Sequence, residues 1–436
     1  MAWIAQSTIF FPAVIGLLTL AACNGCHDGS RFYTVTAVAS PSGSVGPAIS
    51  SVQQGATLTL TVSPASGAIV VGVAGCGGVL TNSNTYTTGA VTADCTVTAT
   101  FARVVTLIEG LVSPWGMVEL PDGRWLVTER SAGLVLINAD KTAMERRIVV
   151  PLPIAVAGQG GLLDVALDPE FATDPWVYIV YAEAGAGAET GLYATTVARG
   201  LLAGNSLTDL QVIYRALPWL PSNYHFGARL AFRADKTLLV TFGERGYGGL
   251  VQQAGNAIGK VMRIARDGSG AETWSVGHRN PQGAAIRPGT DDLWINEHGP
   301  QGGDELDRVV AGGNYGWPVV SYGCNYGDPV GDACQISGGT HAPRFIEPVS
   351  YWVPTSIAPA GLTFYTGNRF PLWRGDVFMG ALAGTALWRV TLASNAETGR
   401  ERLFANLGER IRDVRQGRDG LLYLLTDSGR VMQVRD

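Results

Sequence analysis

Charged residues are scarce in this chain: they make up 15% of its 436 residues, and the formal net charge is −5. No block of clustered Lys and Arg occurs, although such clusters are what phosphate backbones require of a binding protein. Helical periodicity of useful length is also missing, and beyond the N-terminus no apolar run is long enough to cross a bilayer. The sequence therefore argues against a nucleic-acid partner and against a helical membrane domain.

Glycine, by contrast, is abundant, with 57 residues, and short runs rich in Val, Leu and Thr recur between turn signals. Such a composition is typical of a many-stranded β protein with tight turns. The hydrophobic fraction of 46% supports a sizeable core, and the length exceeds that of one typical domain. We expect an all-β chain with two or more folded units, or one large unit with a smaller one.

The first 22 residues are expected to direct export. Residues 8–22 are nearly all apolar or small and end in Leu-Ala-Ala before Cys23, a length that fits a secretory signal better than a spanning helix. This ending resembles a bacterial lipoprotein signal, in which the cysteine is acylated. No Lys or Arg precedes Cys23, so a plain signal peptide is the alternative. We expect a periplasmic or outer-membrane protein, membrane-associated through lipidated Cys23, with a tether over residues 23–30.

The six cysteines agree with export, because disulfides persist in oxidising compartments. Cys76 and Cys95 lie in one small N-terminal segment, and Cys324 and Cys334 bracket a loop rich in Gly, Asp and Pro. Each pair can form a disulfide that restrains a segment with little core of its own. Neither pair has the Cys-x-x-Cys spacing of a metal site, and Cys26 is left over.

Residues 31–102 are expected to form a separate small β module. Residues 57–62 and 96–101 alternate Thr with apolar residues, which is the period-two pattern of a half-buried strand. The segment resembles the internalin-type B-repeats of bacterial surface proteins. It holds no convergent acid–base or ligand cluster, and we interpret it as a spacer or adhesion module.

From residue 104 to the end, one theme returns: an apolar strand, a Pro/Asp/Gly turn and a second apolar strand. The clearest copies are Trp115–Thr128 and Ile411–Thr426. Looser copies begin near Gly161, Ala228, Gly283 and Ala360. Repeats of a few strands with variable loops are typical of β-propellers. We therefore predict an all-β chain with a six-bladed β-propeller over residues 104–436.

Four segments combine polar and glycine residues in patterns that the strands of a propeller do not require. Because the loops at one end of a propeller converge on its central channel, these segments can build one site. They are Gly158–Leu163; Tyr224–Leu230 with Thr241–Glu244; Gly277–Gly283 with residues 297–300 and 304–305; and Arg410–Asp413. Their order, with Gly-Gly-Asn-Tyr-Gly-Trp-Pro at residues 312–318, resembles that of the soluble quinoprotein glucose and aldose sugar dehydrogenases.

This resemblance implies a propeller that holds pyrroloquinoline quinone (PQQ) and calcium. The implied activity is oxidation of the C1 hydroxyl of an aldose sugar to a lactone, by hydride transfer to PQQ. The implied partner is an electron acceptor such as a quinone or a cytochrome. The implied oligomeric state is a monomer or a dimer.

The resemblance also assigns roles to individual residues. His225 is the general base, a role that suits a neutral imidazole near pH 7, and Glu244 orients it. Arg279 and Asn280 stabilise the charge that develops on the reduced quinone. Further implied contacts are Gln159 to the substrate and Gln282, Arg410 and Arg412 to the cofactor, with Trp352 either stacking at the site or packing in the core. The implied calcium ligands are the main-chain carbonyls of Gly299 and Pro300, and a second calcium lies on Glu305 and the backbone of Tyr315.

Two departures from the family pattern leave other functions open. Ala383 stands where the family carries a lysine facing the cofactor, and the stretch between Trp317 and Trp352 is short, which predicts a different substrate rim, closer to the broad aldose type. One alternative is a cofactor-free propeller that binds or adheres, favoured by Ala383 and the N-terminal module. The other is a calcium-dependent lactonase-type hydrolase, disfavoured by Arg279-Asn280 beside Gln282.

Overall fold

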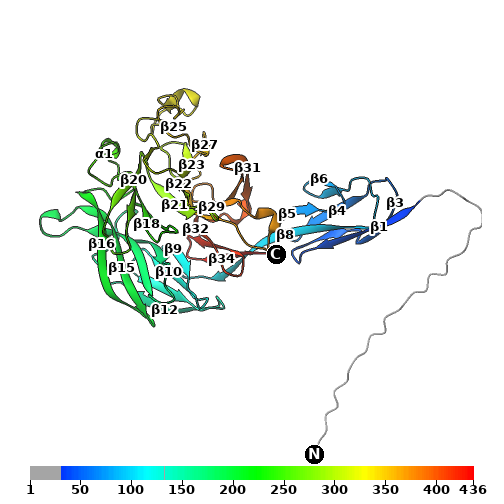
Figure 1. Ribbon diagram of the computed structural model, residues 1–436, viewed down its shortest axis with the longest axis horizontal. Coiled ribbons are helices and arrows are strands. Elements are labelled where there is room, and N and C mark those ends of the chain that lie inside the picture. Colours follow the sequence, from blue (N-terminus) through cyan, green and yellow to red (C-terminus); the bar gives the residue numbers. More distant parts are fainter. Residues whose placement is uncertain (1–30, 132) are drawn as a thin grey trace, which may run out of the picture.

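Six antiparallel sheets of four strands make up most of the chain in a computed structural model, which describes residues 31–131 and 133–436 (Figure 1). The expected signal peptide (1–22), the tether (23–30), Cys23 and Cys26 lie outside these residues. The first strand of each sheet contacts the first strand of the next, in the closed ring β9–β13–β17–β21–β28–β32. The prediction of a six-bladed β-propeller with a small β module is confirmed.

The strands of the first three sheets are β9 (Pro114–Glu119), β10 (Trp125–Glu129), β11 (Gly133–Ile137) and β12 (Met144–Val149); β13 (Leu162–Leu167), β14 (Trp176–Ala184), β15 (Tyr193–Ala203) and β16 (Ser206–Leu220); and β17 (Gly227–Phe232), β18 (Leu238–Phe242), β19 (Lys260–Ile264) and β20 (Glu272–Val276). A two-residue strand, β24 (Gly313–Asn314), runs parallel to β20.

The strands of the other three are β21 (Pro281–Ile286), β22 (Leu293–Glu297), β23 (Asp304–Val309) and β27 (Ser350–Trp352); β28 (Pro359–Phe364), β29 (Val377–Ala381), β30 (Leu387–Ala393) and β31 (Ala396–Leu403); and β32 (Ile411–Gln416), β33 (Leu422–Thr426), β34 (Val431–Arg435) and β8 (Cys95–Ile108). The hairpin β25 (Ser321–Cys324) and β26 (Gln335–Ile336) lies outside them, as do α1 (Gly248–Val251) and the 3-10 turns Gly187–Glu189, Asp332–Cys334, Pro371–Trp373 and Ala405–Leu407. Of the helices in the described ranges, none has the length and apolar character that a bilayer span needs.

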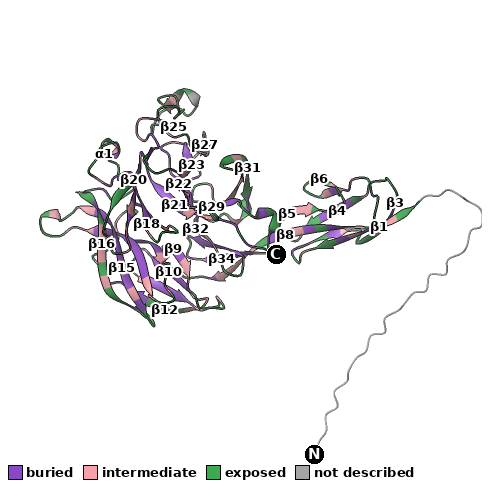
Figure 2. Cartoon of the chain, in the orientation of Figure 1, coloured by how far each residue is buried: buried purple, intermediate pink, exposed green. Residues whose placement is uncertain are grey.

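Apolar clusters fill the space between neighbouring sheets, so each sheet is covered on both faces. The middle strands are therefore continuously buried, as in β10 and β33, instead of alternating (Figure 2). In the N-terminal module the expected alternation holds: β4 (Thr59–Pro64) exposes Thr59 and Thr61 and buries Leu60 and Val62. The two parts of the chain thus have cores of different kinds.

Strand β8 joins these two parts. Its C-terminal half pairs antiparallel with β34 and completes the sixth sheet, while its N-terminal half pairs with β1 and β5 of the module. The boundary expected at residues 102–104 falls inside this strand. The module therefore projects from one side of the propeller, next to the C-terminus (Figure 1).

The remaining strands of the module are β1 (Phe32–Ala39), β2 (Gly43–Gly46), β3 (Ile49–Gln53), β5 (Ala68–Ala74), β6 (Val79–Asn82) and β7 (Thr85–Thr87). On β5, Ile69 and Val71 pack against the core of the propeller. The expected disulfide Cys76–Cys95 ties the end of β5 to the start of β8, and the expected Cys324–Cys334 closes the β25–β26 hairpin.

A buried ion network lies where the inner strands meet. The Arg229 guanidinium is 3.1 Å from the Asp164 carboxylate and 3.2 Å from that of Asp413, and all three side chains are at most 1% exposed. Arg229 also donates to the Gln282 carbonyl (2.6 Å) and lies 4.0 Å above the Trp115 ring. One side chain therefore connects strands of five sheets, counting its own.

Arg229→Met is expected to cost about 3–5 kcal/mol of unfolding free energy, because it leaves two buried carboxylates with less compensation. Urea denaturation measures the loss. Arg308→Met is the matched control, since its pair with Asp292 is partly exposed and such pairs contribute little. Equal losses in the two variants would contradict the role of the network.

Candidate active site

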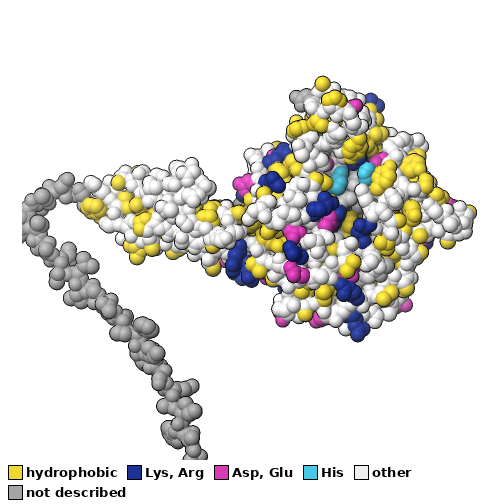
Figure 3. Space-filling model, turned by 180° about the vertical axis from the view of Figure 1, so that it is seen from behind, with side chains coloured by type: hydrophobic (Ala, Val, Ile, Leu, Met, Phe, Trp, Pro, Cys, Tyr) yellow, Lys and Arg dark blue, Asp and Glu magenta, His cyan; other side chains and the backbone are white. Residues whose placement is uncertain are grey.

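Side chains from several sheets surround one cavity of about 310 Å³ near the centre of the ring. Figure 3 shows histidine side chains beside basic and acidic ones near the middle of this face of the propeller. The cavity is lined by Trp115, Arg130, Gly158, Gln159, Gln282, His298, Ala358, Leu382, Arg410, Arg412 and Asp427. Four of the residues expected from the sequence are among them: Gln159, Gln282, Arg410 and Arg412.

His225 stands in the connection between β16 and β17, in the left-handed backbone region at φ 52°. A non-glycine residue there is strained and is held by its surroundings. Its backbone amide donates to Gln159 Oε1 (2.9 Å), and its Nδ1 lies 2.6 Å from Glu244 Oε1. The structure therefore brings His225, Glu244 and Gln159 together, as the sequence predicted.

The electrostatic surroundings keep the His225 ring neutral. Burial lowers the pKa of His225, Glu244 opposes that effect, and the positive charge of Arg279 adds to it. A neutral ring that donates Nδ1–H to Glu244 presents Nε2 as a proton acceptor. The side chain remains 14% exposed, so part of the ring is open to solvent.

Arg279 and Asn280 precede β21 and are fixed by Glu297. The Arg279 amide donates to Glu297 Oε2 at 2.5 Å, and its guanidinium donates to the His298 carbonyl (3.1 Å) and the Tyr326 hydroxyl (3.3 Å). Within the described chain, Arg279 Nε and Asn280 Nδ2 are buried without a hydrogen-bond partner. Buried donors of this kind are unusual unless a ligand or water completes them.

Arg410 and Arg412 share one acidic partner, Asp427. Arg410 Nε donates to Asp427 Oδ2 (2.9 Å) and Arg412 Nε to Oδ1 (2.9 Å), while Arg412 Nη1 donates to Gln282 Oε1 (2.8 Å). Burial alone would raise the pKa of Asp427, but Arg412 and Arg410 outweigh it and hold that pKa below its usual value. The carboxylate therefore stays charged and fixes both guanidinium groups at the cavity wall.

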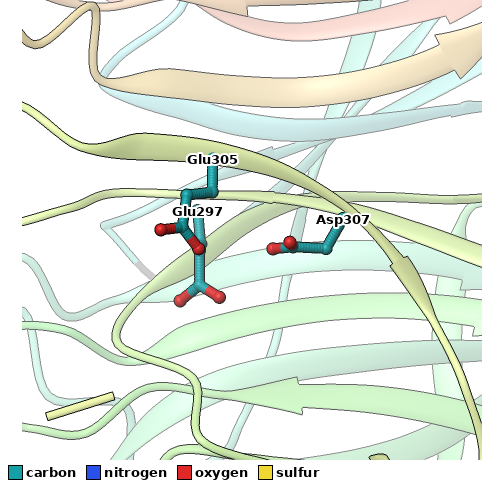
Figure 4. A group of neighbouring side chains, drawn as sticks. All are labelled: Glu297, Glu305 and Asp307. Atoms are coloured by element: carbon teal, nitrogen blue, oxygen red, sulfur yellow. The ribbon is translucent and has the colours of Figure 1, made fainter. Parts of the chain in front are cut away.

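A second polar cluster lies in the fourth sheet, where Glu297, Glu305 and Asp307 point toward one another (Figure 4). One oxygen of each lies within 4.8 Å of the others. Burial, followed by the neighbouring carboxylates, raises the pKa of Glu305 and of Asp307. Three converging buried carboxylates form an oxygen-donor set suited to a hard cation.

The other expected metal ligands are close to this cluster. A small enclosed space is lined by Gly299, Glu305, Tyr315 and Glu297, among others. The Tyr315 hydroxyl donates to the Arg308 carbonyl and accepts from the Val310 amide. The expected metal ligand of this residue is therefore its main-chain carbonyl. The structure thus brings Glu305 and Tyr315 together.

Gly299 and Pro300 form a tight turn whose shape requires glycine. A Cβ on Gly299 would lie 2.3 Å from the carbonyl oxygens of Gly302 and of Gly303. The Gly299 amide donates to Asp304 Oδ1 at 2.9 Å, which fixes the turn. The carbonyl oxygens of Gly302 and Gly303 therefore lie beside Gly299, and calcium binding by the carbonyls of Gly299 and Pro300 stays a prediction.

Trp352, an expected cofactor contact, lies in the apolar core between sheets. It is 5% exposed and packs against Trp388, with ring centroids 5.8 Å apart, and beneath the Arg400 guanidinium. It does not line the central cavity. These contacts are those of the core-packing alternative, and its role as a cofactor contact stays a prediction.

Sequence reasoning missed three polar residues of these sites, Arg130, Asp307 and Asp427, and it placed Glu297 and His298 in a site segment without giving either a role. A signal existed for the acidic pair on β23, because side chains two apart on a strand share one face, which places Glu305 and Asp307 together. No comparable signal existed for Arg130, which meets its partners across two sheets, whereas Asp427 meets Arg410 and Arg412 within the β32–β33 hairpin of the sixth sheet. Burial, above all, lowers the pKa of His298 to about 3, so that residue is neutral.

Comparison with known proteins gives one consistent family. The model of the glucose/sorbosone dehydrogenases matches residues 111–433, and that of the divergent InlB B-repeat domain matches residues 33–105. An aldose sugar dehydrogenase of Escherichia coli is 37% identical over 352 residues, which cover 76% of this chain and 92% of that protein. Quinoprotein glucose dehydrogenase B of Acinetobacter calcoaceticus is 26% identical, over 76% of this chain and 86% of its own. The PQQ-bound aldose sugar dehydrogenase of Streptomyces coelicolor has a TM-score of 0.63 at 28% identity, over 77% of this chain and 98% of that one.

Glu244→Gln is expected to lower the pKa of His225 further, because the carboxylate opposes the effect of burial. NMR titration of the ring protons measures it, with His225→Gln to identify the resonance among the five histidines. Glu272→Gln, an exposed acid paired with Arg263, is the control and should change nothing. An unchanged or raised pKa in Glu244→Gln would show that Glu244 does not act on the ring.

Proposed function

This chain belongs to the glucose/sorbosone dehydrogenase family, and from that premise we propose that it oxidises the C1 hydroxyl of aldose sugars to lactones with PQQ and calcium. It is an oxidoreductase of the sugar dehydrogenase type. The observation that carries the finer proposal is the neutral His225, held by Glu244 and linked through Gln159 to a cavity lined with guanidinium groups.

The residues around the cavity fit PQQ, an ortho-quinone with three carboxylates. Arg410 and Arg412 present guanidinium groups, which bind carboxylates through paired hydrogen bonds. Arg279 Nε and Asn280 Nδ2 are buried donors without partners in the described chain, and they suit the quinone oxygens. The cofactor, when bound, accepts the hydride that leaves C1.

His225 supplies the acid–base chemistry. Its Nε2 takes the proton of the C1 hydroxyl while Nδ1–H remains bonded to Glu244, which stabilises the imidazolium that forms. The His225 backbone is in a strained conformation, and the hydrogen bond from its amide to Gln159 stabilises that conformation. The backbone in turn sets the direction of the ring. The Arg279 guanidinium, whose positive charge acts on His225, is assigned to the negative charge that develops on the reduced quinone.

Calcium fits two positions. The carbonyls of the turn at Gly299 and Pro300 suit the ion that polarises the quinone. The carboxylates of Glu297, Glu305 and Asp307 suit a structural ion, because bringing three buried carboxylates together is unfavourable without a cation. Neither oxygen of Asp307 receives a hydrogen bond from a backbone amide or a cationic side chain of the described chain, and its carboxyl lies against that of Glu297, an arrangement that suits a shared cation.

We also propose that the protein is exported and anchored through lipidated Cys23, and that it delivers electrons to a quinone or a cytochrome. The lipoprotein-type motif and the two disulfides support export. The lactonase alternative has less support, because the cavity wall is cationic, whereas such hydrolases gather acidic and amide side chains on the metal.

His225→Gln is expected to keep PQQ affinity and lose about two to four orders of magnitude in kcat, since the general base is gone. Purified protein is reconstituted with PQQ and calcium, and dye reduction is followed with an aldose. Glu272→Gln, an exposed acid paired with Arg263, is the control. Near-normal turnover in His225→Gln would refute the base assignment, and failure of the parent protein to bind PQQ would favour the cofactor-free binding protein.

Exhaustive chelation is expected to abolish dye reduction and to lower the thermal midpoint, because a cation bound only to the folded state stabilises it by about 2.7 kcal/mol at a hundred times its Kd. Added calcium should restore both. Asp307→Asn should reduce the calcium-dependent rise of the midpoint, whereas Glu272→Gln, on the surface, should not. If chelation changes neither activity nor midpoint, the chain does not use calcium.

A further inference from the structure

Arg130 follows β10 and faces the cavity, although no motif in the sequence points to it. Its Nε and Nη2 donate to the Gly160 carbonyl at 2.9 and 2.7 Å, and Nη2 also donates to the Gly158 carbonyl. These bonds hold the guanidinium against the loop that carries Gln159, which in turn receives the His225 amide. The position of Arg130 is therefore fixed by the loop that also fixes His225.

The charges around the cavity do not balance. Arg130, Arg410 and Arg412 are cationic, Asp427 is the one acid in the lining, and His298 is neutral. Arg410 and Arg412 both pair with Asp427, whereas the hydrogen bonds of Arg130 in the described chain go to carbonyl oxygens. Burial, followed by repulsion from Arg412, lowers the pKa of Arg130. The positive charges of Arg130 and Arg412 therefore repel each other at the cavity wall.

The Arg412 side chain is 14% exposed, whereas Arg130 is half-buried and Arg410 is exposed, so this excess of positive charge lines an open cavity and favours binding of an anion there. On the proposed function, that anion is the cofactor. We propose that Arg130 is a binding residue for the PQQ carboxylates, and that it supplies a positive charge that position 383 does not provide in this chain.

The geometry of the opposite wall agrees with this assignment. Arg410 Nη1 donates to the Leu382 carbonyl at 2.9 Å, so its guanidinium lies against the turn that carries Ala383. Leu382 lines the cavity, and Ala383 follows it on the exposed side of the turn. A polyanion in the cavity is thus met by Arg410 and Arg412 from the sixth sheet and by Arg130 from the first.

The test measures PQQ binding to the full-length protein with calcium, by calorimetry, without reference to turnover. Losing one charge-assisted contact is expected to raise the Kd of Arg130→Gln by about ten- to a hundredfold and to weaken its salt dependence. Arg130→Lys keeps the charge and should lose less. Arg124→Gln, on a surface turn of the same sheet where it pairs with exposed Asp122, is the matched control and should bind as the parent does.

A rescue variant separates charge from the structure of the loop. Because Ala383 follows Leu382, which lines the cavity, the longer side chain of Ala383→Lys should recover part of the affinity in the Arg130→Gln background if charge is what was lost. Equal Kd values for the parent and Arg130→Gln, with normal binding by the parent, would overturn this inference and leave the proposed function standing. Weak binding by Arg130→Gln without any rescue would also overturn it, since the loop would then be the cause. No binding by the parent would overturn the proposed function, and this inference with it.

Discussion

Arg229 sits where the inner strands of the propeller meet, and its guanidinium is the constraint on which the arrangement of the sheets depends. It is paired with Asp164 and Asp413 and covers the ring of Trp115. A buried charge needs all of its partners, so the contributing strands cannot shift independently. A ring of sheets packed only through apolar side chains would lack this directional constraint on register.

The same network reaches the active site. Arg229 donates to the backbone carbonyls of Gln282 and Arg412, and the side chains of these two residues are hydrogen-bonded to each other at the cavity wall. The second wall is fixed differently, through the Arg130 guanidinium and the carbonyls of Gly158 and Gly160. Residues far apart in the sequence are therefore held in place by hydrogen bonds to backbone, which do not vary with side-chain identity.

The sequence was sufficient to predict the six blades, the small β module, both disulfides and the grouping of His225 with Glu244, because each rests on a local pattern or a motif with fixed spacing. It was not sufficient for contacts between sheets. Arg130 follows an ordinary strand of the first sheet, and only the packing of that sheet against the second brings it to the carbonyls of Gly158 and Gly160. The sharing of β8 between the module and the propeller was also beyond reach, since a continuous strand carries no sequence signal of two separate partners.

The two polar regions concentrate opposite charges. The cavity wall gathers guanidinium groups with a single carboxylate, and the fourth sheet gathers Glu297, Glu305 and Asp307, where His278 contacts Glu297 and His341 contacts Glu305. Each arrangement is unfavourable by itself, because burial penalises unpaired charge of either sign. An anionic cofactor and a divalent cation would neutralise both regions at once. A fold with this charge distribution gains stability on loading, and the binding energy of its ligands is also the energy that holds the ends of its strands in the geometry for catalysis.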